Sequence, residues 1–318
     1  MNEEKCTAFL LAAGFGTRLR PLTQIRPKPL LPVGGIPMLD LAYAWLRQQG
    51  HTNVLVNAHH LWPQIAAWAE ENGAQLQVEQ PDILGTGGGL RAALPRLADR
   101  VAIFNGDILA DVDLGALQAA CPEDGAAMAL RTTNELGTIT PVLDRDGQVI
   151  RIGDIIATDD APPKPGGGPG QHFTGIHVMS RAAIERVPAT GFACVVRTAY
   201  RDLVPEGRVQ GVVHPGIWVD VGTPAAYLQA NMDVLDGTLT LSIDPWSRAE
   251  RGLGGSLIGA GARIEGEIDR CVIGAGAVIP QGASLRGCVV WDGVTAPEGV
   301  HQSAVMIANE TTFQVQRG

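Results

Sequence analysis

Apolar runs and stretches with helical spacing alternate along the first 120 residues of the chain. The continuous apolar runs, which are typical of buried strands, lie at residues 7–13, 53–57, 76–79 and 101–105. The stretches with helical spacing lie at residues 38–49, 61–71, 89–97 and 114–120. This alternation predicts an α/β fold, with a Rossmann-like, mainly parallel mixed sheet that helices flank on both faces.

The pattern changes after residue 125, where several short strands follow one another without helices between them. The strands expected there and farther along lie at residues 126–131, 139–143, 148–152, 173–179, 209–213 and 217–219. Asp146-Gly147 is a hairpin signal between two of them. A short helix is expected at residues 181–186. A longer one is expected at residues 223–235, with Thr223 as its N-cap and Pro224 at the first helical position.

An internal repeat begins near residue 252. The motif IGAGARI at residues 258–264 returns almost unchanged at residues 273–279, and a weaker copy lies at residues 290–296. Its apolar spacing, with small residues between, favours a parallel β-helix over a glycine-rich linker. The expected division is a main domain at residues 1–235, a linker at 236–251 and a β-helix at 252–318. We expect the β-helix to serve packing or assembly, such as formation of a homo-oligomer, rather than chemistry.

The composition limits the classes of partner. The chain has 318 residues, of which 45% are hydrophobic, enough for one large domain and a smaller one. A net charge of −9 argues against a nucleic-acid surface or an anionic membrane as partner. No apolar run reaches the length of a membrane span. Five scattered cysteines without a C-x-x-C motif are typical of a reducing compartment. We therefore expect a cytoplasmic protein with buried, unpaired cysteines.

Glycines and two cations follow the first predicted strand. The strand ends in GFGTR at residues 14–18, and Lys28 lies between two prolines. A glycine turn after a strand exposes backbone N–H groups that can bind phosphate. The Walker loop does not fit because no lysine follows Gly16, and the dinucleotide fingerprint does not fit because Leu19 occupies its third glycine position. Two interpretations remain: Arg18 and Lys28 close over a triphosphate, or they are exposed cations on a structural turn.

Two strings near the N-terminus resemble the signature of sugar-1-phosphate nucleotidyltransferases: LAAGFGTRLRPLT at residues 11–23 and PKPLLPV at residues 27–33. Enzymes of this family make an NDP-sugar and pyrophosphate from an NTP and a sugar 1-phosphate. The resemblance extends over roughly residues 1–235, and the C-terminal repeat is similar to the left-handed β-helix that several members carry. It implies that the chain is such an enzyme, with an NTP and a sugar 1-phosphate as its partners.

The resemblance implies a nucleotide site made from two glycine-rich segments. The residues that it assigns to the nucleotide are Leu11, Ala12, Ala13, Gly14, Gly16, Thr17, Gln80, Gly85, Thr86 and Gly87. Arg18 and Lys28 are the implied catalytic residues, which bind the triphosphate while the sugar phosphate attacks the α-phosphorus in line. Gln80 corresponds to a base-reading glutamine of relatives, and an exposed loop amide is the alternative.

Two aspartates follow predicted strands. Asp107 comes after the strand at 101–105, and Asp220 after the strand at 217–219. Ligands of parallel sheets gather at the carboxyl ends of strands. The resemblance implies that this pair holds Mg²⁺, which prefers a few carboxylates together with phosphate oxygens. Each aspartate taken alone is also typical of a helix or turn cap.

The resemblance also implies a sugar site. Its residues are Asn105, Gly137, Asp154, Thr174 and Gly175. Relatives commonly carry a glutamate followed by a lysine that grips the sugar phosphate, whereas this chain has Asp154 followed by Ile155. Lys164, in a loop rich in glycine and proline, is either a substitute for that lysine or an exposed loop side chain.

The substrate stays open at this point. The departures in the sugar site resemble the N-acetylmuramate-1-phosphate uridylyltransferase branch, whereas the β-helix is similar to that of mannose-1-phosphate guanylyltransferases. Two alternatives lie outside sugar transfer. One is a nucleotidyltransferase for another phosphate, such as phosphocholine, and the other is a non-catalytic regulatory subunit that binds nucleotide sugars.

Overall fold

The structure is a computed structural model that describes residues 6–133, 140–153, 156–157, 170–247, 249–309 and 311–315. It divides into two compact units. The first unit comprises Met1–Gly14, Trp45–Gly106 and Ala110–Trp218. The second unit comprises Phe15–Ala44, Asp107–Leu109 and Val219–Gly318. The division of the sequence at residues 235 and 251 stays a prediction.

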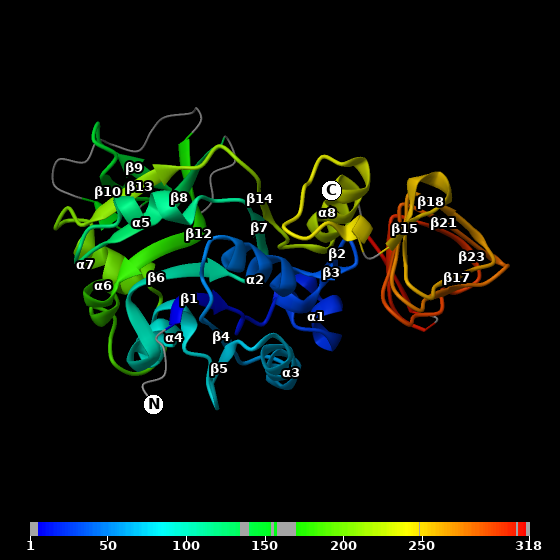
Figure 1. Cartoon of the computed structure of the whole chain (residues 1–318), viewed down its shortest axis with the longest axis horizontal. Helices are drawn as coiled ribbons and strands as arrows, with labels where there is room; N and C mark the ends of the chain where they lie inside the picture. Colours follow the sequence, from blue (N-terminus) through cyan, green and yellow to red (C-terminus); the bar gives the residue numbers. More distant parts are fainter. Residues whose placement is uncertain are drawn as a thin grey trace. The chain divides into compact units, whose positions relative to one another are not determined.

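A seven-stranded mixed sheet forms the centre of the first unit (Figure 1). Its strands, in spatial order, are β13 (Val209–Val213), β8 (Ala126–Thr133), β12 (Gly170–Ser180), β6 (Leu97–Asn105), β1 (Cys6–Leu11), β4 (Val54–Ala58) and β5 (Gln75–Val78). Strands β6, β1, β4 and β5 are parallel neighbours, whereas β12 runs antiparallel to β6 and β8. Every residue of β4 is buried, as expected for an apolar strand between helical layers. The predicted α/β fold is confirmed.

Helices and a small sheet surround this core. The helices are α3 (Trp62–Asn72), α4 (Gly85–Ala93), α5 (Leu114–Ala120), α6 (Arg181–Glu185) and α7 (Arg201–Leu203), while α2 (Met38–Gln48) crosses from the second unit into the first. The small sheet consists of β9 (Pro141–Leu143), β10 (Val149–Ile152) and β11 (Ile156–Ala157), and the predicted hairpin at Asp146-Gly147 joins the first two. The helix expected at residues 89–97 begins earlier and ends before Pro95, because proline interrupts an α-helix.

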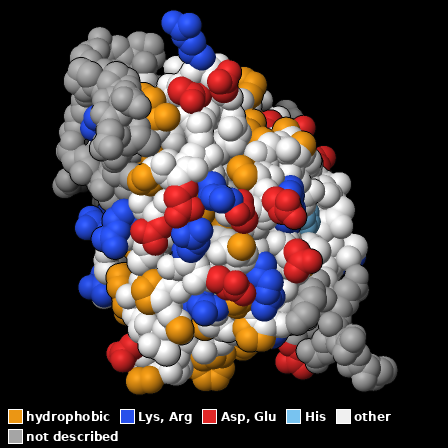
Figure 2. Space-filling view, turned by 90° about the vertical axis from the view of Figure 1, so that its left-hand side faces the viewer, with side chains coloured by type: hydrophobic (Ala, Val, Ile, Leu, Met, Phe, Trp, Pro, Cys, Tyr) orange, Lys and Arg blue, Asp and Glu red, His pale blue; other side chains and the backbone are white. Residues whose placement is uncertain are grey.

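Charges of both signs are interspersed on the face of the molecule that Figure 2 shows. In the first unit, Arg186 pairs with Glu206 at 2.9 Å, and Arg208 pairs with Glu206 and Asp124. These side chains are partly exposed, so each pair contributes little to stability. No helix among the described residues is long and apolar enough to cross a membrane.

The predicted C-terminal repeat forms a β-helix in the second unit. Its largest sheet contains β15 (Ala249–Arg251), β16 (Leu257–Gly259), β19 (Val272–Ile273), β22 (Val289–Val290), β24 (Ala304–Ala308) and β25 (Thr311–Gln314). Its other two sheets contain β17 (Arg263–Ile264) with β20 (Val278–Ile279), and β18 (Glu267–Asp269) with β21 (Ala283–Arg286) and β23 (Gly299–Gln302). Leu257, Val272, Val289 and Val305 stack in parallel register, one per coil. All four are buried, so the repeat builds a continuous apolar core.

The rest of the second unit carries the N-terminal cations. Its remaining elements are α1 (Leu22–Ile25), β2 (Pro32–Val33), β3 (Ile36–Pro37) and α8 (Pro224–Asp236). The hydroxyl of Thr223 accepts a hydrogen bond from Ala226 N–H at 3.2 Å, which confirms the predicted N-cap of α8. A two-stranded ladder pairs β7 (Ile108–Ala110) with β14 (Trp218–Asp220) where the chain crosses between units.

Three cysteines confirm the expected buried, unpaired state: Cys121, Cys271 and Cys288. Cys194 is free and half-buried. The side chain of Cys6 lies outside the described residues.

Candidate active site

A cluster of two cations and two carboxylates lies in the second unit. Lys28 Nζ is 2.6 Å from Asp107 Oδ2 and 3.4 Å from Asp220 Oδ1. Arg18 joins the cluster, with Nη2 3.9 Å from Asp220 Oδ2. The Lys28 side chain is only 9% exposed, whereas that of Arg18 is 69% exposed. The structure thus brings together the two predicted cations and the two predicted metal ligands.

The strand ladder explains why two distant aspartates meet. Asp107 immediately precedes β7, and Asp220 is the last residue of β14. At the other end of the ladder, Asp111 N–H donates to Ile217 O at 3.3 Å. The strands therefore run in opposite directions, and the start of β7 faces the end of β14.

Short turns fix the segment that carries Lys28. A 3₁₀ turn spans Lys28–Leu30, and Leu31 N–H donates to Lys28 O at 3.1 Å. Gly16 adopts a left-handed backbone with φ of 58°. A Cβ atom at Gly16 would lie 2.8 Å from Thr23 Cγ2 and 3.1 Å from Lys28 Cβ. Glycine is therefore required there both by its φ and by the close approach of the lysine stem.

Arg18 reaches the cluster over a second glycine. A Cβ atom at Gly222 would lie 3.0 Å from Asp220 Oδ2 and 3.2 Å from both terminal nitrogens of Arg18. The absence of a side chain at this position leaves room for the guanidinium beside the carboxylate. Because Arg18 is mostly exposed, its donors are accessible to a ligand from solvent.

The carboxylate pair fits a magnesium ion by its chemistry. Both carboxylates already converge on one cationic atom, Lys28 Nζ. No group of three or more histidine, cysteine, aspartate or glutamate side chains with metal-site geometry occurs among the described residues. Mg²⁺ is typically held by one or two carboxylates together with substrate phosphates rather than by an all-protein cage. Asp107 and Asp220 supply that kind of donor set.

A buried polar chain in the first unit links Ala12, which precedes the first glycine segment, to Leu84, which precedes the second. Ala12 N–H donates to Asn57 Oδ1 at 2.7 Å, and Asn57 Nδ2 donates to Glu79 Oε1 at 2.7 Å. Leu84 N–H donates to Glu79 Oε2 at 2.8 Å, just before Gly85. Asn57 and Glu79 are each 2% exposed. They fix the backbone at Ala12 and at Leu84, and neither was among the site residues expected from the sequence.

The predicted nucleotide residues differ in exposure. Gly14, Thr17, Gln80 and Thr86 are exposed. The remaining six are buried or half-buried: Leu11, Ala12, Ala13, Gly16, Gly85 and Gly87. Some polar groups of the second segment are already used within the protein. Gly87 N–H donates to Ala193 O at 2.9 Å, and the Thr86 hydroxyl accepts from Val195 N–H at 3.1 Å.

The predicted sugar residues lie partly outside the described structure. Gly137 and Asp154 fall there, as do Ile155 and Lys164. Asn105 pairs with Leu11 in the β1–β6 ladder. Gly175 has a φ of 81° at an irregularity in β12. Thr174 is 1% exposed, and its hydroxyl donates to Ala129 O at 2.9 Å.

Trp218 connects Thr174 to a cation that the sequence analysis did not identify. The Trp218 indole N–H donates to Thr174 O at 2.8 Å. The guanidinium carbon of Arg131 lies 4.9 Å from the centre of the Trp218 ring, and its Nη1 donates to Trp218 O at 3.3 Å. The sequence does not indicate the contact between Arg131 and Trp218, because it depends on how distant strands pair in the folded sheet.

His177 has a structural rather than a metal-binding environment. Its Nδ1 lies 2.6 Å from the hydroxyl of Tyr200, and both residues are buried. Burial lowers the pKa of His177 to about 3. The imidazole is therefore neutral at physiological pH.

Comparisons with known proteins show which proteins the chain is similar to. A family model described as the MobA-like NTP transferase domain matches residues 8–203. A mannose-1-phosphate guanylyltransferase of Mycobacterium tuberculosis is 29% identical over 316 residues, which cover 94% of this chain and 83% of that protein. An N-acetylmuramate alpha-1-phosphate uridylyltransferase of Neisseria meningitidis is 32% identical over 225 residues, which cover 68% of this chain and 93% of that protein.

A solved structure supports the fold. HddC from Yersinia pseudotuberculosis matches with a TM-score of 0.58 at 22% identity, over 71% of this chain and 98% of that one. The same protein has also been solved in complex with GMP-PN, with the same TM-score.

Proposed function

The chain belongs to the family of the MobA-like NTP transferase domain, whose members are nucleotidyltransferases, and from this premise we propose that it transfers the nucleotidyl group of an NTP to a sugar 1-phosphate. The products are an NDP-sugar and pyrophosphate. The observation that carries the proposal is the convergence of Arg18, Lys28, Asp107 and Asp220 in one cluster.

The reaction is a single in-line displacement. An oxygen of the sugar phosphate forms a bond to the α-phosphorus, and the bond from that phosphorus to the bridging oxygen of pyrophosphate breaks. Lys28 binds the α-phosphate region or the entering phosphate, and Arg18 binds the triphosphate together with the backbone of residues 14–17. The protein contributes positioning and charge stabilisation rather than a covalent intermediate.

Asp107 and Asp220 are the residues that hold Mg²⁺ in this proposal. When bound, the ion supplies charge neutralisation at phosphate oxygens. Lys28 would exchange part of its contact with the carboxylates for contact with phosphate when a nucleotide binds. Because its amine has three donors, it can keep one carboxylate contact while it binds an anion.

For the substrate pair we propose GTP and mannose 1-phosphate. The support is that the similarity to the mycobacterial guanylyltransferase extends over 94% of the chain, which includes the β-helix. UTP with N-acetylmuramate 1-phosphate is the second candidate, supported by the 32% identity to the Neisseria protein. Transfer to phosphocholine and a regulatory, non-catalytic role are the further alternatives. Assembly through the β-helix stays a prediction.

The test is pyrophosphate release from each of the four common NTPs with a panel of phosphates that includes mannose 1-phosphate, N-acetylmuramate 1-phosphate and phosphocholine. We expect release with one sugar 1-phosphate, strongest with GTP and mannose 1-phosphate. Release with phosphocholine alone would change the substrate class. Absence of release with every pair, together with binding of a nucleotide sugar, would overturn catalysis in favour of the regulatory role.

A further inference from the structure

The segment at residues 26–34, which carries Lys28, touches the β-helix at one of its ends. The guanidinium carbon of Arg26 lies 4.6 Å above the centre of the Trp291 ring. Trp291 follows β22, is 2% exposed, and donates its backbone N–H to Met306 O at 3.0 Å in the next coil. The ring is therefore held by the scaffold of the β-helix, and a cation over an indole face is attracted to it.

The same indole also binds α8. Trp291 Nε1 donates to the hydroxyl of Tyr227 at 3.0 Å. Tyr227 is fully buried, and burial raises the pKa of its phenol, so the hydroxyl stays neutral. A buried hydrogen bond between two large side chains fixes both, because breaking it leaves a polar group unsatisfied.

One turn farther along α8, Asn231 holds the other end of the segment. Asn231 Oδ1 accepts from Gly34 N–H at 2.9 Å, and Asn231 Nδ2 donates to Tyr227 O at 2.9 Å. Asn231 is completely buried. Gly34 has a φ of 60°, and a Cβ there would lie 3.1 Å from Val234 Cγ1, so the segment is packed closely onto the helix. Both ends of the segment are thus tied to one structure formed by Trp291 and α8.

Helix α8 also begins next to the second carboxylate. Asp220 ends β14, and Thr223 caps the helix. Helix α8, which anchors the lysine segment, therefore begins four residues after Asp220, a residue that contacts Lys28.

We propose that Trp291 is a positioning residue for Lys28, so that the β-helix takes part in catalysis by holding the lysine segment. This inference rests on the proposed function. Trp291 acts through Arg26 and Tyr227 and touches neither the cluster nor a substrate in this account. A displaced lysine segment weakens contact with phosphate, and small misplacements of a catalytic group reduce rates strongly.

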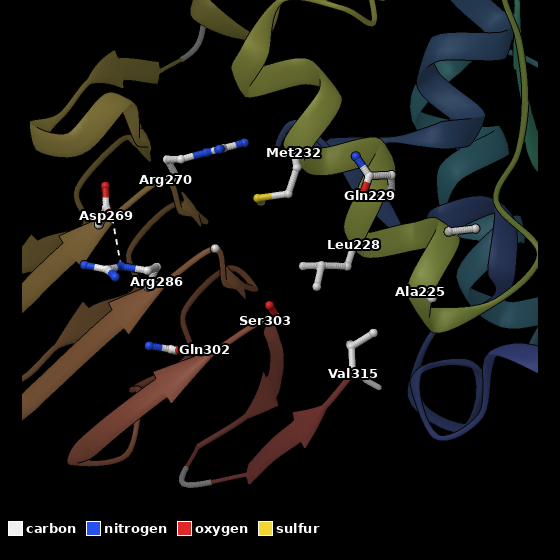
Figure 3. Close-up of a pocket in the computed structure, with 12 residues that line it drawn as sticks. Ala225, Leu228, Gln229, Met232, Asp269, Arg270, Arg286, Gln302, Ser303 and Val315 are labelled. Atoms are coloured by element: carbon white, nitrogen blue, oxygen red, sulfur yellow. Dashed lines mark ion pairs between the residues drawn. The ribbon is translucent and has the colours of Figure 1, made fainter. Parts of the chain in front are cut away.

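A groove along another part of α8 contains Met232, which we use for a matched control variant (Figure 3). It has a volume of about 880 Å³ and lies between α8 and corners of the β-helix. Leu228 and Met232 of α8 line it together with Arg270, Arg286 and Ser303 of the β-helix. Met232→Ala changes the surface of α8 toward the β-helix without removing an anchor of the lysine segment.

The experiment measures kcat and KM for pyrophosphate release by the full chain, with the substrate pair that the panel identifies. We expect Trp291→Leu to lower kcat about ten- to hundredfold. Trp291→Phe, which keeps a ring under Arg26, should recover much of that loss, and Met232→Ala should stay near wild type. Arg26→Leu removes the contact between Arg26 and Trp291 by changing the lysine segment instead of the β-helix. It replaces Trp291→Leu in the experiment if that variant does not fold.

A variant cycle separates positioning from general destabilisation. In the background of Lys28→Ala, Trp291→Leu should lower the rate no further, because the residue that it positions is absent. Losses that multiply in the double variant, or Trp291→Leu and Arg26→Leu proteins with wild-type kcat, would overturn the inference.

Amide hydrogen exchange tests the positioning of the lysine segment independently of the proposed enzymatic activity. If the wild type releases no pyrophosphate with any pair, the function fails, and the positioning of the segment is still measured. The amides of Leu30 and Leu31, which donate to Pro27 O and Lys28 O, should exchange at least about threefold faster in Trp291→Leu than in Met232→Ala. Equal exchange would contradict the role of Trp291.

Discussion

Lys28 Nζ and Asp107 Oδ2 lie 2.6 Å apart in the second unit, although the two residues belong to distant parts of the sequence. The lysine is nearly buried, and its amine also lies 3.4 Å from Asp220. An amine that bridges two carboxylates occupies the kind of position that a divalent cation would take. Lys28 is therefore coupled to any metal bound by this pair.

Lys28→Ala should lower NDP-sugar formation at least a hundredfold while the fold stays intact. Loss of one charge-stabilising contact typically costs about 2.7–4 kcal/mol of barrier. The measurement is kcat by pyrophosphate release, with the thermal midpoint as a check of folding. Arg186→Ala, which removes a partly exposed pair with Glu206, is the control with expected wild-type kcat. Near-normal turnover in Lys28→Ala would exclude Lys28 from catalysis.

Asp220→Asn should raise the Mg²⁺ concentration needed for half-maximal activity about tenfold or more, because one of two anionic ligands is lost. Asp236→Asn, which removes an exposed partner of Arg270 in the same unit, should leave it unchanged. Lys28→Ala should bind Mg²⁺ at least as well as the wild type in calorimetry without nucleotide, since a competing cation is removed. Weaker Mg²⁺ binding in Lys28→Ala would contradict the idea that the Lys28 amine and Mg²⁺ compete for the same two carboxylates.

Gly16→Ala should lower the free energy of unfolding by about 1–3 kcal/mol and reduce activity. The left-handed backbone is unfavourable for alanine, and the added Cβ would meet Thr23 Cγ2 at 2.8 Å. Gly14→Ala is the matched comparison, because a Cβ there would have no atom within 4 Å. Its unfolding free energy should stay within about 0.5 kcal/mol of wild type. Equal urea midpoints for the two variants would contradict this interpretation.

Glu79→Ala should destabilise the first unit and raise KM for the NTP. The substitution removes the acceptor for both Asn57 Nδ2, which is buried, and Leu84 N–H, which is partly buried. Leaving the buried donor of Asn57 unsatisfied costs about 1–3 kcal/mol. Urea unfolding and NTP-dependent kinetics measure the two effects. The exposed residue Glu70 offers a control, since Glu70→Ala should change neither quantity. A stable Glu79→Ala protein with wild-type KM would show that the polar chain does not hold the glycine segments.

Stability should fall in acid partly because of His177. Its pKa is about 3 in the folded protein, below the ordinary value of 6.5, so the unfolded state binds the proton first. The contribution of His177 is complete above pH 6.5 and is lost as the pH falls toward 3. At pH 5 the loss is about 2 kcal/mol, since one pH unit corresponds to about 1.36 kcal/mol. Unfolding of His177→Gln at pH 7 and pH 5 should show a smaller pH effect than wild type, whereas an equal effect would place the titration elsewhere.

The sequence predicted the fold well where periodicity was strong. Stacking of Leu257, Val272 and Val289 follows directly from the repeat, and the strands of the main sheet follow from apolar runs. Helix α4 was misplaced because glycines at its start are typical of a loop. Tertiary contact decides that case: Gly87 N–H and Gly88 N–H both donate to Ala193 O, which only the folded chain brings close.

The sequence indicated which residues form the candidate cluster but not how their side chains are arranged. The resemblance implied Arg18, Lys28, Asp107 and Asp220 as site residues, yet no sequence spacing places an amine between two carboxylates. Asn57 and Glu79 were missed, although Asn57 lies near the end of the buried apolar strand β4 and Glu79 comes directly after β5. A polar side chain in that position has to find a partner when it is buried, and this is the signal that could have found both.

Anomalous diffraction from crystals of the full chain, grown with Mn²⁺ in place of Mg²⁺ and a non-hydrolysable NTP analogue, tests whether Asp107 and Asp220 bind the metal next to Lys28. We expect an anomalous peak within coordination distance of carboxylate oxygens from both Asp107 and Asp220, with Lys28 Nζ within hydrogen-bond distance of a phosphate oxygen. A metal bound away from these two carboxylates, or an NTP whose phosphates lie remote from Lys28, would contradict it.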